Sequence, residues 1–371
     1  MKIKKVLLSL KKAVMPLALC FTVLIVSLSL SENLGGFFYK VTLFSSVVAM
    51  PQGAPALFSK NEEPKKENET ASQTVSKEEV VQTQNTETPS LSQNNQSQIA
   101  VTPPENAGKI SEYAIKSSET STKIIKYSGA YFSNTSNKSN SDILKVLKQS
   151  PKIPYTEGKP QVLIYHTHTT ESYELNDLGY YIKGSSSRTT NEKENMVRVG
   201  EEIAKKLKEA GIEVIHDKTV HDYPSYNGAY QRSAQTVNNI LKKYPSISIT
   251  LDIHRDAIEQ SGGVRVKPTA VINGKKAAQI MIIGGVDDGT MDYKNWKENL
   301  KFASSLQVQL QKDYNGLTRA VMVCHRRYNM HLTDNSLLIE MGGHANTLDE
   351  AVYSGELLGT SLSKVILQNR G

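Results

Sequence analysis

The sequence predicts an α/β domain with a mainly parallel, twisted sheet and helices on both faces. In the second half of the chain, short apolar runs rich in β-formers alternate with longer segments of helical apolar spacing. Two of these runs end in histidine, within HTHTTESY (166–173) and LDIHRDA (251–257). In open α/β folds, binding sites lie at the carboxyl edge of the sheet, so these histidines mark a candidate site.

Five apolar runs predict strands of this sheet, and one further segment predicts a hairpin. The strands are expected at 161–165, 212–216, 247–253, 317–323 and 336–342. Between 269 and 285, the pair Asn273-Gly274 separates two apolar runs, which is a strong signal for a tight β-hairpin.

Helices are predicted between the strands. In the segment 193–210, Val197, Ile203 and Leu207 recur on one face, and Gly211 is a stop signal. Further helices are expected at 226–244, 295–314 and 348–367, and a short one at 141–149.

The N-terminus has the pattern of a membrane anchor. A lysine-rich tail (1–12) precedes an uncharged apolar segment within 13–32, which is long enough to cross a bilayer as a helix. Basic residues hold such a tail in the cytoplasm, so the remainder is expected outside the cytoplasm as part of a single-pass membrane protein. A cleaved signal peptide is the alternative, with small residues at 45–50.

Residues 33–140 are predicted to form an extracytoplasmic flexible linker. No aromatic residue occurs from Ser59 to Glu112, and polar residues and prolines dominate. Such a composition cannot bury enough apolar surface to offset the entropy of ordering. The globular domain is therefore assigned to 141–371, although the sequence leaves 113–154 uncertain.

Charge and cysteine content exclude some classes of protein. The net charge of +7 comes without a basic stripe interleaved with aromatics, so nucleic-acid binding is not expected, whereas an anionic cell wall or membrane suits the charge. Cys20 lies in the apolar segment and Cys324 in the globular part, so no intramolecular disulfide is expected.

The two strand-end histidine motifs could hold a zinc ion. Catalytic zinc takes three protein ligands and keeps a position for water. His254 is one candidate, and either His168 or His166 is a second because they are two residues apart in an extended chain. A carboxylate would complete the set, and the candidates are Glu171, Glu192 and Glu194.

Glu340 is the candidate general base. It lies near the end of the otherwise apolar run 336–342, where an ionised side chain is costly unless it faces a site. A carboxylate there could take a proton from water and pass it to a leaving amine. A strand-end ion pair with Arg255 or Arg319 is the structural alternative.

Several motifs in order resemble the stage II sporulation protein P family of membrane-anchored peptidoglycan hydrolases. Besides HTHTTESY and DIHRDA, they are YNGAYQRS (226–233), RYNMHL (327–332) and IEMGGHANT (339–347). The resemblance covers 155–371, and the layout of anchor and linker also fits. The family is similar in turn to zinc-dependent N-acetylmuramoyl-L-alanine amidases.

The amidase pattern implies particular roles for residues in this sequence. Its first histidine corresponds to His168, its Glu-Lys pair to Glu192-Lys193, and its second histidine to His254. The resemblance thus implies that His168, Glu192 and His254 bind Zn²⁺ and that Glu340 is catalytic. His166 remains an alternative to His168, and Glu194 and Glu171 remain alternatives to Glu192.

The resemblance also implies a function. The enzyme would cleave the amide between N-acetylmuramic acid and L-alanine of peptidoglycan, with a further endopeptidase activity on cross-links. It would thin septal wall between mother cell and forespore during engulfment, with stage II sporulation proteins D and M as partners. The alternatives are a cell-wall zinc peptidase or deacetylase, and a non-catalytic wall-binding module.

Overall fold

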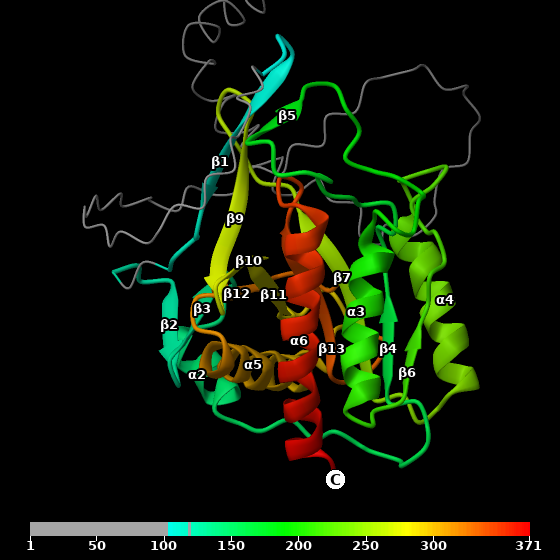
Figure 1. Cartoon of the computed structure of the whole chain (residues 1–371). Coiled ribbons are helices and arrows are strands. Elements are labelled where there is room, and N and C mark those ends of the chain that lie inside the picture. Colours follow the sequence, from blue (N-terminus) through cyan, green and yellow to red (C-terminus); the bar gives the residue numbers. More distant parts are fainter. Residues whose placement is uncertain (1–102, 118–119) are drawn as a thin grey trace, which may run out of the picture. The chain divides into compact units, whose positions relative to one another are not determined.

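The computed structural model describes residues 103–117 and 120–371, and its centre is a mixed eight-stranded sheet (Figure 1). The strand order is β2-β3-β12-β11-β13-β7-β4-β6. The strands are β2 (Ile124–Tyr127), β3 (Ala130–Asn134), β4 (Val162–Tyr165), β6 (Val214–His216), β7 (Ile249–Asp256), β11 (Ile280–Gly285), β12 (Val321–Cys324) and β13 (Ser336–Gly343).

The sheet is mainly parallel, as the sequence predicts. Neighbours from β13 through β7 and β4 to β6 are parallel, and so are β11 with β12 and β12 with β3. The pairs β2–β3 and β11–β13 are antiparallel. The chain passes from β7 to β11 through strands of a second sheet and not through a helical crossover. It therefore enters β11 at the edge where β7 ends, and runs in the opposite direction.

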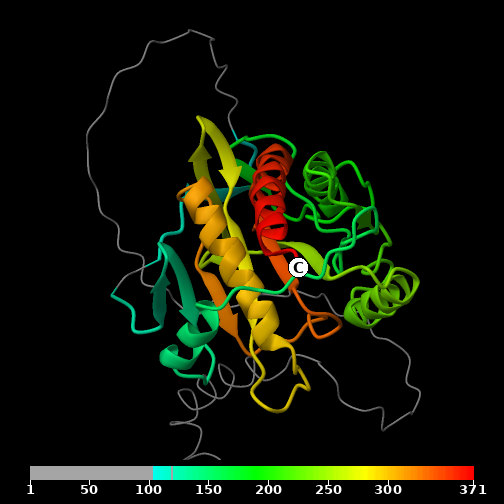
Figure 2. The same ribbon diagram turned by 90° about the horizontal axis from the view of Figure 1, so that it is seen from below.

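Helices cover both faces of this sheet (Figures 1 and 2). They are α3 (Met196–Glu209), α4 (Ala229–Lys243), α5 (Trp296–Asp313) and α6 (Leu348–Asn369). The apolar residues of α3, α5 and α6 join one large core with Val162 and Ile164. Val237 of α4 packs with Leu163 and Tyr165, whose side chains alternate to the other face. The two-sided cover predicted from the sequence is confirmed.

Local capping fixes where the predicted helices begin and end. Asn195 caps α3 by accepting a hydrogen bond from the Val197 amide at 3.0 Å, and Gly211 follows the helix with a positive φ of 78°. Thr347 and Glu350 form a reciprocal capping box at the start of α6. The predicted short helix is α2 (Asn140–Leu147), whose last carbonyl accepts a hydrogen bond from Ser304 Oγ.

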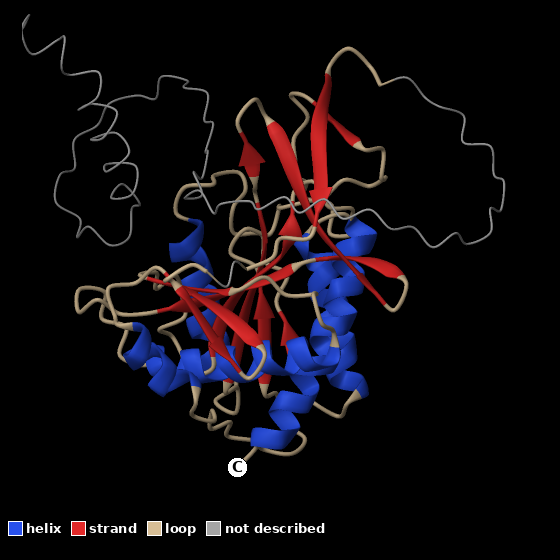
Figure 3. Cartoon of the chain, turned by 90° about the vertical axis from the view of Figure 1, so that its left-hand side faces the viewer, coloured by secondary structure: helices blue, strands red, loops and turns tan. Residues whose placement is uncertain are grey.

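A second, smaller sheet lies beside the first (Figure 3). It joins β10 (Lys275–Ala278), β9 (Val264–Ile272), β1 (Ala107–Tyr113) and β5 (Tyr180–Ile182), while β8 (Glu259–Gln260) pairs with β9. The β9–β10 hairpin turns at Asn273 and Gly274, both with positive φ, as the sequence predicts. Strands β1, β5 and β8 are not evident from the sequence.

The predicted linker boundary is wrong. Strands β1, β2 and β3 all lie within 33–140, and Phe132 of β3 is fully buried. Tertiary pairing supplies their partners, because β1 joins β9 and β3 joins β12. The predicted tail (1–12), anchor (13–32) and earlier linker lie outside the described residues. Of the helices in 103–117 and 120–371, none combines the length and apolar character needed to span a membrane.

Candidate metal centre

His168, Glu171 and His254 converge at the carboxyl edge of the sheet. All three are buried, and one potential ligand atom from each lies within 4.8 Å of the others. His254 belongs to β7, while His168 and Glu171 lie in the turns directly after β4. Because β4 and β7 are parallel neighbours, their ends deliver these side chains to one place.

Two carboxylates flank His254. Its Nδ1 lies 3.5 Å from Glu171 Oε2, and its Nε2 lies 2.9 Å from Asp252 Oδ1. The ring N–H is poorly aligned with the Asp252 oxygen, so this short contact is chiefly electrostatic. Burial opposes a charged imidazole, but Asp252 and Glu171 outweigh it and raise the pKa of His254 well above its usual range. The geometry leaves Nδ1 to face a metal while Asp252 orients the ring.

Glu171 is held from several directions. Its Oε1 lies 3.5 Å from His168 Nδ1 and 3.4 Å from an Arg188 nitrogen, and the Arg255 amide donates a hydrogen bond to Oε2 at 3.2 Å. Burial by itself would raise the pKa of Glu171, but His168 and His254 outweigh it and hold the pKa well below its usual range. Glu171 is therefore an ionised carboxylate between two imidazoles.

Glu340 lies next to this cluster on the same face of the sheet. In the parallel pairing of β13 with β7, its Cα is the register partner of His254. Its Oε2 is inaccessible to solvent and has no hydrogen-bond partner among the described residues. Burial, reinforced by the charge of Asp256, raises the pKa of Glu340 to about 8. Glu340 is half-buried as a whole, and an unpartnered carboxyl oxygen beside potential metal ligands is typical of a catalytic acid or base. The strand-end alternative does not hold for Arg319, which pairs with Asp256 at 2.8 Å.

The structure does not bring Glu192 to the cluster. Helix α3 begins only at Met196, so Glu192 lies on the exposed turn before it, with its carboxylate 3.6 Å from Lys218 Nζ. Glu194 also precedes the helix and is not part of the cluster. Glu192 lies away from the two histidines because the Glu-Lys pair does not open the helix here, and Glu171, one of the two alternatives, lies between them.

His166 points to the opposite face of the sheet. Strand β4 ends at Tyr165, so the two-residue repeat does not extend to His168. His166 lies under α3, with Nδ1 3.0 Å from the Ile253 carbonyl and Nε2 2.9 Å from His216 Nε2. A Cβ on Gly200 of α3 would lie 2.8 Å from His166 Nε2, so the helix approaches closely. Burial lowers the pKa of His166 to about 4, as expected of a neutral core imidazole.

Two features of the site are missing from the sequence-based prediction. Asp252 accepts hydrogen bonds from the amide and hydroxyl of Thr167 at 2.8 and 2.7 Å, which fixes it beside His254. The sequence could have indicated this, because residues two apart in a strand point to the same face and Asp252 is two residues before His254. The second feature is an aromatic group. Tyr226 stacks on His168 with ring centroids 4.6 Å apart, and Tyr230 contacts both histidines.

The donor set fits a zinc ion. Two imidazoles and one carboxylate are the ligands of many catalytic zinc sites, which keep a further position for water. The cluster is buried, and Asp252 supplies the outer carboxylate that commonly orients a histidine ligand.

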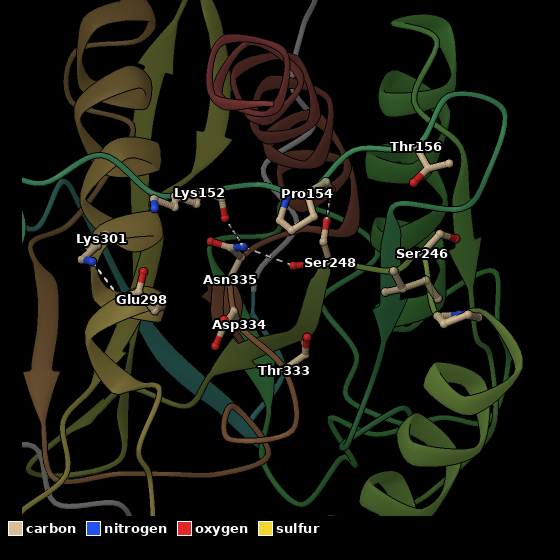
Figure 4. A pocket seen from close by; sticks show the side chains of 12 residues that line it. Lys152, Pro154, Thr156, Ser246, Ser248, Glu298, Lys301, Thr333, Asp334 and Asn335 are labelled. Carbon is tan, nitrogen blue, oxygen red and sulfur yellow. Dashed lines mark hydrogen bonds and ion pairs between the residues drawn. The ribbon is translucent and has the colours of Figure 1, made fainter. Parts of the chain in front are cut away.

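A pocket of about 650 Å³ lies elsewhere, at the amino edge of the sheet (Figure 4). Asn335, directly before β13, donates hydrogen bonds there to the carbonyls of Lys152 and Ser248. Its twelve lining residues include no histidine and none of the residues of the cluster. The pocket is therefore separate from the candidate metal centre.

The sequence matches one protein family and a curated member of it. The stage II sporulation protein P family matches residues 39–363. Stage II sporulation protein P of Bacillus subtilis (strain 168) is 32% identical over 218 residues, which are 55% of this chain and 50% of that protein. The chain thus spans about half the length of the curated relative it matches.

Solved amidase structures are more distantly similar. N-acetylmuramoyl-L-alanine amidase AmiC2 of Nostoc punctiforme is 13% identical with a TM-score of 0.34, and covers 57% of this chain and 98% of its own. The CwlD amidase of Clostridioides difficile, solved with the GerS lipoprotein, is 15% identical with a TM-score of 0.34, and covers 56% and 98%. Similarity at this level carries no functional conclusion. The family match, in contrast, covers most of the sequence, and by it this chain belongs to the stage II sporulation protein P family.

Proposed function

We propose that the protein is a zinc-dependent peptidoglycan hydrolase that cleaves the amide between N-acetylmuramic acid and L-alanine of the stem peptide. The observation that carries this proposal is the buried cluster of His168, Glu171 and His254 with Glu340 on the neighbouring strand. Membership of the sporulation family supports a role in remodelling of the cell wall.

The residues of the cluster have two roles, which are to bind the metal and to orient a ligand. His168, Glu171 and His254 would hold the ion, which when bound supplies a Lewis acid for the amide carbonyl and acidifies a water. Asp252 keeps the His254 ring oriented, with Thr167 holding Asp252 in turn. The chain thus provides a fixed site that needs little rearrangement during the reaction.

Glu340 would move the proton. It takes a proton from the attacking water and delivers it to the departing L-alanine nitrogen as the carbon–nitrogen bond breaks. A group that does both works best with a pKa near the working pH. The raised pKa of Glu340, about 8 without a metal, brings it into that range, and a nearby cation would lower it.

The cellular setting belongs to the same proposal. The basic tail and apolar segment at 1–32 would anchor the enzyme in the membrane with its domain outside the cytoplasm. There it would act on septal wall during engulfment, with stage II sporulation proteins D and M as partners and with an additional activity on peptide cross-links.

Replacing Glu340 with Gln tests the mechanism. Loss of the proton acceptor should reduce release of stem peptides from purified peptidoglycan by about 10²- to 10⁴-fold. Zinc content, measured by elemental analysis of the full chain, should remain at the wild-type value. A Glu298→Gln variant, at the opposite edge of the sheet, is the control and should retain activity. Undiminished cleavage by Glu340→Gln would exclude Glu340 as the base.

Mass spectrometry of the products separates the competing functions. An amidase releases intact stem peptides and leaves glycan chains with free lactyl groups. A peptidase would release fragments of the stem, a deacetylase would release acetate, and a wall-binding module would release nothing.

A further inference from the structure

We propose that the hydroxyl group of Tyr230 is a catalytic hydrogen-bond donor, which contacts the amide carbonyl oxygen as that oxygen gains negative charge. This inference rests on the proposed function and adds a residue to the reaction. The segment 226–233, which contains Tyr230, has no role in the mechanism so far.

The ring of Tyr230 lies at the metal cluster. It is nearly parallel to His254, with ring centroids 6.4 Å apart and an interplanar angle of 11°. Its ring and the His168 ring form a T-shaped pair, with centroids 5.5 Å apart and an interplanar angle of 72°. Tyr230 is in the first turn of α4, the helix that covers the sheet face bearing His254 and Glu340. It therefore lies over the cluster on the helix-covered side of this sheet face.

The surrounding residues hold Tyr230 in place. The Tyr328 ring stacks on it with centroids 5.2 Å apart, and the Asn329 side chain donates a hydrogen bond to its backbone carbonyl at 3.0 Å. Asn329 also bonds to Ser233 Oγ, which contacts Thr167, the partner of Asp252. Tyr230 and Asp252 thus belong to one hydrogen-bonded network, and Asp252 lies 2.9 Å from His254 Nε2.

The hydroxyl of Tyr230 is free to act on a substrate. Within 103–117 and 120–371 no residue forms a hydrogen bond with it, although the backbone carbonyl of the same residue accepts two. The side chain is half-buried. A phenol remains protonated at neutral pH and can donate. A fixed donor aimed at developing charge is worth more than the same group in water.

A hydrogen-bond donor would add to the stabilisation that a bound ion gives the carbonyl oxygen. When water adds to the amide carbon, the carbonyl oxygen takes up the electron pair of the C=O bond, and Glu340 receives the proton of the water. The carbon–nitrogen bond then breaks, and that proton goes to nitrogen. Tyr230 gives up no proton in this sequence, and its hydrogen bond strengthens only while the oxygen is charged.

The test compares Tyr230→Phe with Tyr244→Phe in the full chain. Tyr244 is the C-terminal cap of α4, far along the helix from Tyr230, and serves as the matched control. The Tyr230→Phe variant keeps the aromatic ring and its stacking contacts, so thermal stability and zinc content should not change. Removal of one such donor should lower kcat about 10²- to 10³-fold with little change in KM. An inhibitor with a tetrahedral phosphinate in place of the scissile amide should bind more weakly by a similar factor.

The outcomes separate the two proposals. An active wild-type protein together with undiminished kcat in Tyr230→Phe overturns the role of Tyr230 alone. A lower kcat with unchanged phosphinate affinity also overturns it, because the hydroxyl would then act elsewhere. Failure of the wild-type protein to release stem peptides overturns the proposed function and, with it, this inference.

Discussion

At the scale of single residues, backbone context decides which carboxylate lies in the candidate metal centre. Glu171, Glu192 and Glu194 have the same chemistry, but only Glu171 lies in the turn that follows β4 and faces both His168 and His254. Glu192 has an exposed carboxylate beside Lys218. Burial between two imidazoles makes Glu171 the candidate ligand, whereas Glu192 forms a surface ion pair, and such pairs contribute little to stability.

Replacement of each glutamate by Gln tests this assignment. Changes to residues that only orient the ligands weaken metal binding by about 10- to 100-fold. Glu171→Gln should weaken zinc binding by more than this, because the charge of a ligand is lost. Glu192→Gln should leave zinc affinity unchanged. Competition with a chromophoric chelator measures both, with circular dichroism to confirm folding. Equal affinities for Glu171→Gln and the wild type would contradict the assignment.

At the scale of elements, helix α3 and strands β4 and β6 enclose a neutral histidine pair. His166 and His216 contact each other beneath Gly200, and burial lowers the pKa of both, that of His166 to about 4. The folded state therefore disfavours protonation relative to the unfolded chain, where the ordinary value is 6.5. The stability from the neutral pair is present above pH 6.5 and is lost as the pH falls toward 4.

The pair predicts a specific acid sensitivity. Between pH 6.5 and 4 the wild type should lose stability on the order of 3 kcal/mol from His166, at about 1.4 kcal/mol per pKa unit. His216→Gln, which can still bond to His166 but cannot titrate, should show a shallower decline. Urea unfolding at a series of pH values measures this. Parallel profiles for the two proteins would show that the pair does not control acid stability.

At the scale of the whole molecule, residues before position 141 are part of the folded domain. Strand β1 lies between β9 and β5, and β3 covers the edge of β12. Lys267 of β9 is buried with carboxylates from three segments, at 3.3 Å from Glu112, 2.8 Å from Asp177 and 2.9 Å from Glu350. Removal of β1 therefore breaks both a strand pairing and part of an ion-pair cluster.

Two truncated chains test this boundary. A protein that starts at residue 103 should unfold cooperatively, whereas one that starts at 141 lacks Phe132 and exposes the edge of β12. Loss of a buried aromatic side chain alone costs about 3–5 kcal/mol, and an open strand edge promotes association. Urea unfolding and size-exclusion chromatography compare the two. Matching unfolding midpoints would place the domain boundary at 141 after all.

The sequence alone determined the features that depend on local pattern. Alternating apolar runs predicted the main strands and helices, Asn273-Gly274 predicted its hairpin, and strand-end residues predicted His168, His254 and Glu340 as neighbours. These features follow from periodicity, turn chemistry and the rule that parallel strands end at one edge.

Only the tertiary structure decided what depends on long-range partners. Glu171 and not Glu192 lies beside the two histidines, because α3 begins later than the motif suggests. His166 and His168 point to opposite faces of the sheet, because β4 ends at Tyr165. The tertiary structure also brought Tyr230 from α4 to the histidines and gave β1 its place in the second sheet. Short polar strands and loop side chains carry little local signal, since the energy that fixes them comes from contacts with residues far away in the chain.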